Sequence, residues 1–136
     1  MKNRILLFFV SALVVSLTNF CYAQKGPEEI VNQFFDSYKV SPSGAVDELL
    51  NSNTWMAENQ GALNQVKTQL NNAVQLIGDY KGFEKISEVK KGESLVQLIY
   101  FVRYDRQPLR FVFLFYKPDD QWRIQNFLFD EKFLED

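Results

Sequence analysis

Tyrosines, carboxylates and a few isolated polar side chains offer most of the chemistry in this sequence. The 136-residue chain contains no histidine and one cysteine, Cys21. The lack of histidine excludes Ser-His-Asp and Cys-His nucleophile systems, zinc sites of the HExxH type and a histidine pH switch. Cys21 falls in a segment that we predict to be removed. A mature chain without histidine and cysteine lacks the usual ligands of zinc, copper, haem and iron–sulfur clusters, so only cations bound by oxygen, such as calcium or magnesium, remain. The chain has no Asp-x-Asp-x-Asp-Gly loop to hold either ion, so we expect no cofactor.

Aromatic and isolated polar side chains remain as candidates for binding chemistry. We expect a ligand site to draw on six of them near the junction of helices and sheet: Tyr38, Trp55, Tyr80, Tyr100, Arg103 and Asn126. Such a site would combine an apolar lining with a few placed polar groups, as small-molecule pockets do.

Most of these candidates also have a structural interpretation. Tyr38 and Tyr100 continue apolar stripes, which favours core positions with a hydroxyl that reaches water or a carbonyl. Trp55 follows a predicted helix end, a position that favours a buried ring at the bottom of the core. Arg103 lies in an apolar run, where an ion pair with a neighbouring strand competes with an anion-binding role. Asn126 is a polar outlier on the strand face that we expect it to share with Ile124 and Leu128, and it needs hydrogen-bond partners if it is buried.

The N-terminal segment differs in composition from the rest of the chain. Lys2 and Arg4 precede an uncharged stretch over 5–20, and small residues stand three and one positions before a cut after Ala23. This order is typical of a secretory signal peptide, so we predict a signal peptide over 1–23 and a single domain over 24–136. An uncleaved membrane anchor and a lipoprotein signal at Cys21 are the alternatives. All three place the domain outside the cytoplasm, periplasmic or secreted, and an uncleaved segment would keep it on a membrane.

The charge balance of the 24–136 domain excludes one class of partner. The whole chain has 15 basic and 17 acidic residues, and loss of Lys2 and Arg4 leaves 13 basic residues and a balance of −4. A surface that binds nucleic acid needs a net basic face to release counterions, so we expect no nucleic-acid partner. The same balance argues against electrostatic docking on anionic lipid.

Three segments in the first half of this domain show helical periodicity. We expect helices over about 27–39, after Ser41-Pro42, and over about 57–77, where the helix ends at Gly78. The longest helix carries one apolar stripe: Leu63, Val66, Leu70, Val74 and Ile77. Its opposite face holds Asn64, Lys67, Gln69, Asn71 and Gln75. We expect this polar face to be solvated, with a contact surface for a partner as the alternative.

After Gly78 the apolar period changes from helical to alternating. Turn residues at 90–93, 105–108 and 117–120 separate four expected strands at about 82–90, 94–105, 109–117 and 121–130. Connections this short permit hairpins and exclude parallel crossovers, so we predict an antiparallel meander in an α+β fold. Glu84 and Glu88 are expected to share one face of the first strand, which suits a solvated edge.

The middle strands are apolar on both faces. An antiparallel sheet covered on one side normally alternates apolar and polar residues. The second strand instead carries Val96, Leu98, Tyr100, Val102 and Tyr104 against Leu95, Ile99 and Phe101. One helix layer covers one face, so we expect a homodimer that packs sheet on sheet through the outer face. The alternative is a monomer wrapped by the long helix and the tail over 127–134.

The closing strand and the order of elements carry a resemblance to a known family. Three helices before a curved antiparallel sheet that closes with QWRIQNFLFD (121–130) resemble the nuclear transport factor 2-like superfamily, which includes ketosteroid isomerase and small exported bacterial proteins. The stretch GDYKGFE (78–84) is similar to the lead-in to the first long strand in exported members. The resemblance covers about 27–130 and implies a cone with a pocket between the helices and the concave face of the sheet.

Two kinds of function follow from that resemblance. The isomerase places acid–base residues in its pocket, where an apolar wall raises carboxyl pKa values. Its tyrosine and two aspartates have no matching positions here, because acidic residues fall at expected corners: Asp79, Glu93, Asp105, Asp119 and Asp120. We therefore expect an exported noncatalytic module that binds a small hydrophobic ligand, a peptide or a protein. A carboxylate and tyrosine acid–base enzyme, isomerase-like or dehydratase-like, and a purely structural dimer are the alternatives.

Overall fold

The computed structural model describes residues 24–133. The predicted signal peptide, with Cys21, lies outside the described residues, and so does Leu134 at the end of the tail. Within 24–133, no helix combines the length and the hydropathy needed to cross a bilayer.

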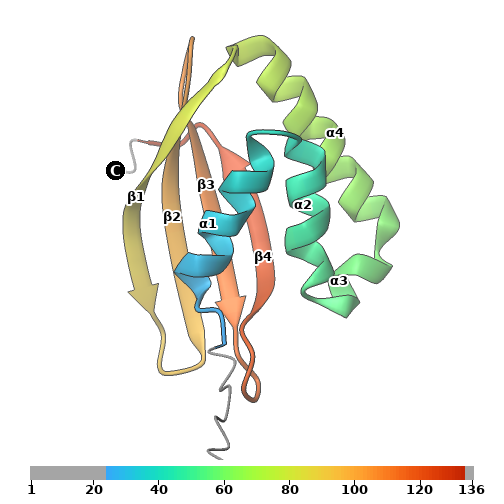
Figure 1. The fold of residues 1–136 in the computed structure, drawn as a ribbon, viewed down its shortest axis with the longest axis vertical. Coiled ribbons are helices and arrows are strands. Elements are labelled where there is room, and N and C mark those ends of the chain that lie inside the picture. Colours follow the sequence, from blue (N-terminus) through green and yellow to red (C-terminus); the bar gives the residue numbers. More distant parts are fainter. Residues whose placement is uncertain (1–23, 134–136) are drawn as a thin grey trace, which may run out of the picture.

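Four helices precede four strands in the described part of the chain (Figure 1). The helices are α1 (Pro27–Tyr38), α2 (Pro42–Asn51), α3 (Thr54–Glu58) and α4 (Gln60–Ile77). The strands are β1 (Tyr80–Lys90), β2 (Leu95–Tyr104), β3 (Leu109–Tyr116) and β4 (Arg123–Asp130). They form one sheet in the order β1-β2-β3-β4, and each neighbouring pair is antiparallel. The predicted α+β class and the antiparallel meander are confirmed.

The number of helices is larger than we expected, because two asparagines cap separate helices. The Asn53 side chain accepts a hydrogen bond from the Trp55 N–H and starts α3, and the Asn59 side chain accepts one from the Ala62 N–H and starts α4. A capping side chain satisfies backbone donors that a continuous helix would use itself. The single helix expected over 57–77 is therefore wrong in its first turn, and the structure has four helices in place of three.

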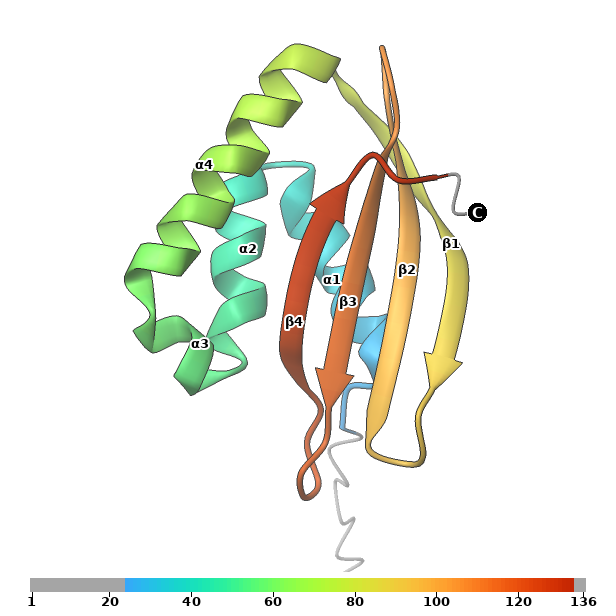
Figure 2. The ribbon, with the colours of Figure 1, turned by 180° about the vertical axis from the view of Figure 1, so that it is seen from behind.

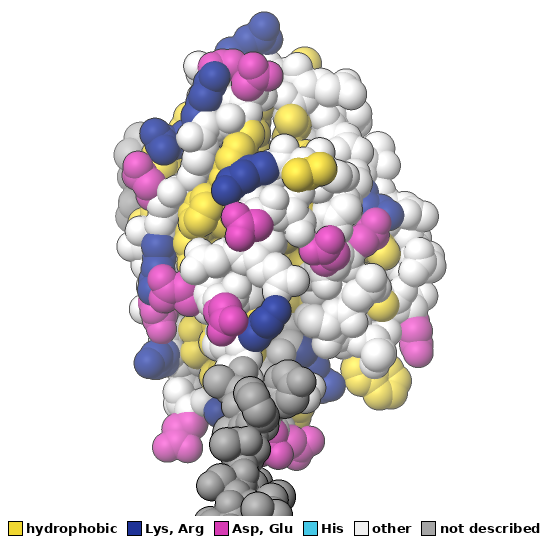
Figure 3. Space-filling view, viewed as in Figure 1, with side chains coloured by type: hydrophobic (Ala, Val, Ile, Leu, Met, Phe, Trp, Pro, Cys, Tyr) yellow, Lys and Arg dark blue, Asp and Glu magenta, His cyan; other side chains and the backbone are white. Residues whose placement is uncertain are grey.

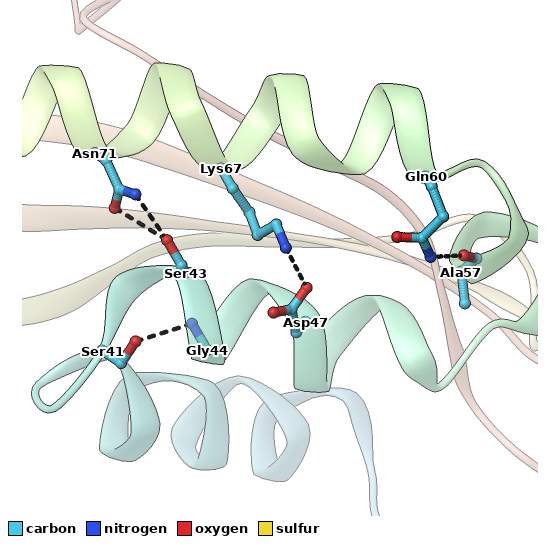
Figure 4. A network of polar contacts seen from close by, with 8 residues as sticks. All are labelled: Ser41, Ser43, Gly44, Asp47, Ala57, Gln60, Lys67 and Asn71. Atoms are coloured by element: carbon cyan, nitrogen blue, oxygen red, sulfur yellow. Dashed lines mark hydrogen bonds and ion pairs between the residues drawn. The ribbon is translucent and has the colours of Figure 1, made fainter.

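The polar face of α4 is only partly solvated (Figure 4). The Lys67 ammonium lies 2.9 Å from the Asp47 carboxylate of α2, and the Asn71 amide donates to the Ser43 hydroxyl over 2.8 Å. These contacts hold α4 against α2. The expectation of solvent exposure is wrong for Lys67, whose side chain is 22% exposed, whereas Asn71 is exposed as expected although it also bonds Ser43. The other three residues of that face, Asn64, Gln69 and Gln75, are exposed as expected.

The core lies between α1 and the inner face of the sheet. Figure 1 shows α1 directly in front of the strands, α2 to the right of α1, and α4 to the right of α2. Phe34 and Phe35 of α1 are buried against rings of the sheet, and Phe34 meets Phe113 edge-on at a centroid distance of 5.2 Å. Phe35 stacks on Phe83 of β1 at 4.1 Å. Aromatic rings therefore fill the space between α1 and the sheet.

The outer face of the sheet carries no helix (Figure 2). The chain after β4 crosses one end of this face, where Phe133 meets the Phe101 ring edge-on at 5.6 Å. The expectation that the helices leave one face open is confirmed for the described residues. The alternative was a monomer wrapped by the long helix and the tail. Its helix part is wrong, because α4 packs against α2 and does not cover this face, whereas the described part of the tail does cross one end of it.

Three register shifts interrupt the sheet, and two of them change which of the predicted side chains share a face. Ile86 is an extra residue in β1, so Glu84 pairs with Phe101 while Glu88 pairs with Leu98, which points to the opposite face of β2. The expectation that the two glutamates share a face is therefore wrong. A bulge inserts one residue and reverses the alternation beyond it.

The shift in β4 has the same consequence for the last strand. Ile124 pairs with the buried Phe115, whereas Leu128 pairs with Val112 of the outer face. Gln125 is the extra residue between them. The expectation that Ile124, Asn126 and Leu128 share a face is wrong, because only Asn126 and Leu128 lie on the outer one.

Candidate functional site

The six candidate residues lie in three separate places. Tyr38, Tyr80 and Tyr100 belong to the aromatic core under α1. Trp55 and Asn126 line one apolar groove beside α3. Arg103 is exposed on β2. The six residues therefore do not form the single site that we expected.

Tyr38 takes part in a buried cluster of three tyrosines. Its hydroxyl forms a hydrogen bond with the hydroxyl of Tyr104, and its ring lies 5.6 Å from that of Tyr80. Burial raises the pKa of Tyr104 to about 12, and burial raises that of Tyr38 still further. Both phenols therefore stay protonated near neutral pH and cannot act as bases. Tyr104 was not predicted as a site residue, because it alternates with other apolar residues along β2 and no sequence pattern singles it out.

Tyr100 is enclosed by other rings. It lies 5.6 Å from Phe35 and 5.9 Å from Phe83, and 1% of its surface is exposed. Its hydroxyl is buried and has no hydrogen-bond partner among the described residues, and the same holds for the hydroxyl of Tyr80. Burial raises the pKa of Tyr100 to about 12. The expectation of a core tyrosine is confirmed, but the hydroxyl reaches no carbonyl.

We expect Tyr100→Phe to leave the free energy of unfolding unchanged or to raise it by about 1 kcal/mol. The substitution removes a buried hydroxyl that has no protein partner and therefore carries a desolvation cost. Tyr38→Phe is the matched control, and it should lose about 1–3 kcal/mol because it leaves the Tyr104 hydroxyl unpaired. Urea denaturation measures both values. A loss above about 1 kcal/mol in Tyr100→Phe would show that its hydroxyl has a partner.

Acidic residues do not accompany these tyrosines in the core. Among residues 24–133, the buried polar residue is Asn53, and no aspartate or glutamate is buried. The pKa of Asp105 is lowered by its hydrogen bond with Lys81, and that of Asp130 is lowered by Arg110. A carboxylic acid that serves in acid–base catalysis usually has its pKa raised by an apolar wall. No aspartate or glutamate of residues 24–133 lies against such a wall, since none of them is buried.

Asn53 connects α3 to the edge of the sheet. Its amide donates to the Ile124 carbonyl of β4 over 2.7 Å, and its side-chain oxygen accepts from the Trp55 N–H over 3.1 Å. The bond to β4 places α3 beside that strand, and the cap directs the next residue, Trp55. From the sequence alone, Asn53 looks like the end of a helix and nothing more.

We expect Asn53→Ala to lower the free energy of unfolding by about 2–3 kcal/mol. The variant loses a helix cap and leaves the buried Ile124 carbonyl without its donor. Asn59→Ala is the control, since the exposed Asn59 caps α4 but bonds no strand, and it should lose about 1 kcal/mol. Thermal or urea unfolding of both variants makes the comparison. Equal losses would mean that the bond to β4 contributes nothing.

The groove beside α3 brings Trp55 and Asn126 together. It has a volume of about 310 Å³ and lies between α3, the start of α4 and the edge strand β4. Its lining is uncharged: Leu50, Trp55, Met56, Asn59, Ala62, Leu63, Val66, Asn126 and Phe127. Trp55 is 71% exposed, so the expectation that it plugs the core is wrong. Hydrophobic side chains also gather over α3 at the lower right of Figure 3. We call this cavity the α3–β4 groove.

A second cavity of about 290 Å³ lies between α1, α2 and the turn before β4. Lys25 and Glu48 line it, and each already has a partner: Lys25 donates to the Gln33 side chain, and Glu48 accepts from the Ser37 hydroxyl. Trp122 closes one side, and the Lys117 ammonium lies 5.0 Å from its ring centre. The charged groups of this cavity are thus engaged within the protein.

Arg103 forms an ion pair with a neighbouring strand, which confirms its predicted structural role. Its Nε lies 3.8 Å from a carboxylate oxygen of Glu84 on the neighbouring strand, and both side chains are about half exposed. The guanidinium also passes so close to Gly82 that a Cβ atom there would lie 2.7 Å from it. An exposed pair of this length contributes little to stability. Its contacts on β1 explain the position of Arg103 without a bound anion.

The outer face of the sheet presents an apolar centre with polar ends. The pairing register aligns Ile99, Val112 and Leu128 in one row across β2, β3 and β4. Phe101 and Leu114 lie in the rows on either side of it, Leu95 and Tyr116 pair one row beyond Leu114, and all four are half-buried. At one end the Arg110 guanidinium binds both carboxylate oxygens of Asp130 over 2.8 and 2.7 Å. At the other end the Arg123 guanidinium lies over the Tyr116 ring at 5.6 Å.

Metal ligands are not grouped in the described part of the chain. Within residues 24–133, no group of three or more histidine, cysteine, aspartate or glutamate residues is arranged to hold a metal ion.

Comparison with known proteins identifies no relative of this chain. The chain matches no protein-family model, no curated protein and no solved structure.

Proposed function

We propose that this protein is an exported noncatalytic interaction module that associates with a second copy of itself through the outer face of its sheet. The observation that carries the proposal is the row Ile99, Val112 and Leu128, which lies in the middle of a face without a helix. Apolar patches of this kind mark contact surfaces in water-exposed proteins. The uncharged stretch behind Lys2 and Arg4 supports export.

The distribution of polar groups on this face supports a protein partner. Stable interfaces have an apolar centre and a polar rim that stays partly wet. The ion pair of Arg110 with Asp130 and the contact of Arg123 with Tyr116 lie on opposite sides of the apolar row, along the strands, and would form such a rim. A two-fold axis through the row would bring the same patch of both copies together.

The finer fold assignment belongs to the same proposal. We infer a cone of the nuclear transport factor 2-like kind, supported by helices before an antiparallel meander and by the closing strand over 121–130. Aromatic side chains fill the space between α1 and the sheet, which is the interior of this cone, as the stack of Phe35 on Phe83 illustrates. The proposal therefore locates binding on surfaces of the fold. Acid–base chemistry is not part of it, because no buried carboxyl group lies beside the tyrosines of residues 24–133.

The molar mass of the purified protein tests self-association. Light scattering coupled to size exclusion, run over a range of concentrations, should give twice the mass of one chain at high micromolar concentration. A mass of one chain at every concentration would end the proposal. Fractionation of the producing cells tests export separately, since a protein found only in the cytoplasm would contradict it.

A further inference from the structure

The α3–β4 groove runs beside a strand edge that no strand of residues 24–133 occupies. The sheet order ends at β4, whose one partner among the described strands is β3. At the start of this edge, side chains take the place of a strand: the Ile124 carbonyl accepts from Asn53, and the Ile124 N–H donates to the Ser52 hydroxyl over 3.4 Å. The edge then continues past the groove at Asn126 and Phe127. A free strand edge presents backbone donors and acceptors to any extended chain that reaches it.

The wall opposite this edge is apolar and includes an exposed tryptophan. Trp55 is 71% exposed at the rim, and Leu63 of α4 forms part of the lining. Tryptophan is enriched among residues that dominate binding energy at interfaces. The volume of about 310 Å³ is at the lower end for a small-molecule pocket, which suits one or two side chains of a larger partner.

The groove chemistry selects one class of partner. A hydrocarbon ligand would satisfy the apolar wall but would leave the backbone groups of the β4 edge without partners. A charged segment would lose hydration against a lining that contains no charged residue. An extended segment of uncharged residues satisfies both sides, because its backbone pairs with β4 while alternate side chains face the pocket.

We propose that the α3–β4 groove binds an extended, uncharged peptide segment of another protein, which adds to the outer edge of β4 and places an aliphatic or aromatic side chain beside Trp55. Asn126, which lines the groove from β4, provides an exposed amide for the added segment. This site differs from the surface proposed for self-association, since it uses the edge of the sheet and the wall formed by α3 and α4, and it meets the outer face only at Asn126.

Fluorescence anisotropy with labelled synthetic peptides tests the proposal. The probes are peptides of about seven residues in which serine or threonine alternates with valine, leucine or phenylalanine, with zero net charge. Each has a matched peptide whose alternate amides are N-methylated along one edge. We expect saturable binding of one peptide per chain, and N-methylation of the pairing edge should weaken it at least about tenfold.

Two substitutions on α4 locate the site. Ala62→Phe fills the groove from an exposed lining position and should weaken peptide binding at least about tenfold. Asn64→Phe places the same side chain on the exposed face of α4, outside the lining, and should leave the affinity unchanged. Circular dichroism and thermal unfolding establish that both variants are folded.

Several results would overturn the proposal. No saturable binding by any probe up to about 1 mM would exclude a peptide site, and equal binding of the N-methylated peptides would exclude pairing with the strand edge. Saturable binding of octanol without peptide binding would identify a small-molecule site. The titration is repeated on Ile99→Glu, a variant of the outer face on β2, two strands from the β4 edge, which should bind with unchanged affinity whether or not the protein forms dimers. Loss of peptide binding in that variant would place the site on the outer face.

Discussion

The Phe35→Ala variant is expected to lose about 3–5 kcal/mol of its free energy of unfolding, the largest loss that we expect from one substitution in this domain. Phe35 is fully buried on α1 and stacks on Phe83 at 4.1 Å. Its ring also lies within 6.1 Å of those of Tyr100, Phe111 and Phe113. Rings on three strands and on α1 surround it, so the cavity left by alanine cannot close by moving one neighbour.

Chemical denaturation of Phe35→Ala at constant temperature measures this loss. A shift of the midpoint without a change in slope would assign the effect to native stability. Phe133→Ala is the control: that ring is 37% exposed and meets Phe101, so it should lose about 1 kcal/mol or less. A loss below about 1 kcal/mol in Phe35→Ala would mean that the core between α1 and the sheet is loosely packed.

Local periodicity was enough to predict the kinds of elements. The strands were predicted within two residues of their observed ends, because alternation and turn residues are both properties of neighbouring positions. The stripe of Leu63, Leu70 and Ile77 likewise predicted the buried face of α4. These features depend on the chain within a few residues of each position, which one sequence contains in full.

Features that depend on distant residues were not predictable in the same way. The bulges at Ile86 and Gln125 become visible only against a partner strand, and each reverses the face assigned to later residues. The contact of Lys67 with Asp47 depends on the rotation of α4 against α2. A polar residue opposite an apolar stripe therefore does not have to face water.

The candidate site shows the same division. Trp55 and Asn126 were selected for their residue types, and the structure places both on one groove. The reason is Asn53, whose bond to Ile124 brings α3 to β4 across 71 positions of the sequence. No local pattern distinguishes this asparagine from a helix end, so the sequence indicated two members of the groove without predicting that they meet.

The Leu128→Glu variant is expected to be a folded monomer at concentrations where the unaltered protein is a dimer. Leu128 is 39% exposed and lies in the middle row of the outer face beside Val112. A two-fold contact through this row would desolvate one introduced carboxylate from each copy, and burial of an unpaired charge costs several kcal/mol. We expect the dissociation constant to rise on the order of 100-fold or more. Light scattering against concentration measures this change.

Leu76→Glu is the matched control, since Leu76 is 71% exposed on α4, outside the sheet. It should keep the mass of a dimer, and circular dichroism should show both variants folded. If Leu128→Glu remained dimeric while Leu76→Glu dissociated, self-association would use the helical side. A dimer in both variants would exclude each of these surfaces as the contact. Dissociation of Leu128→Glu alone would tie self-association to the apolar row, because the two variants differ only in where the same charge is introduced.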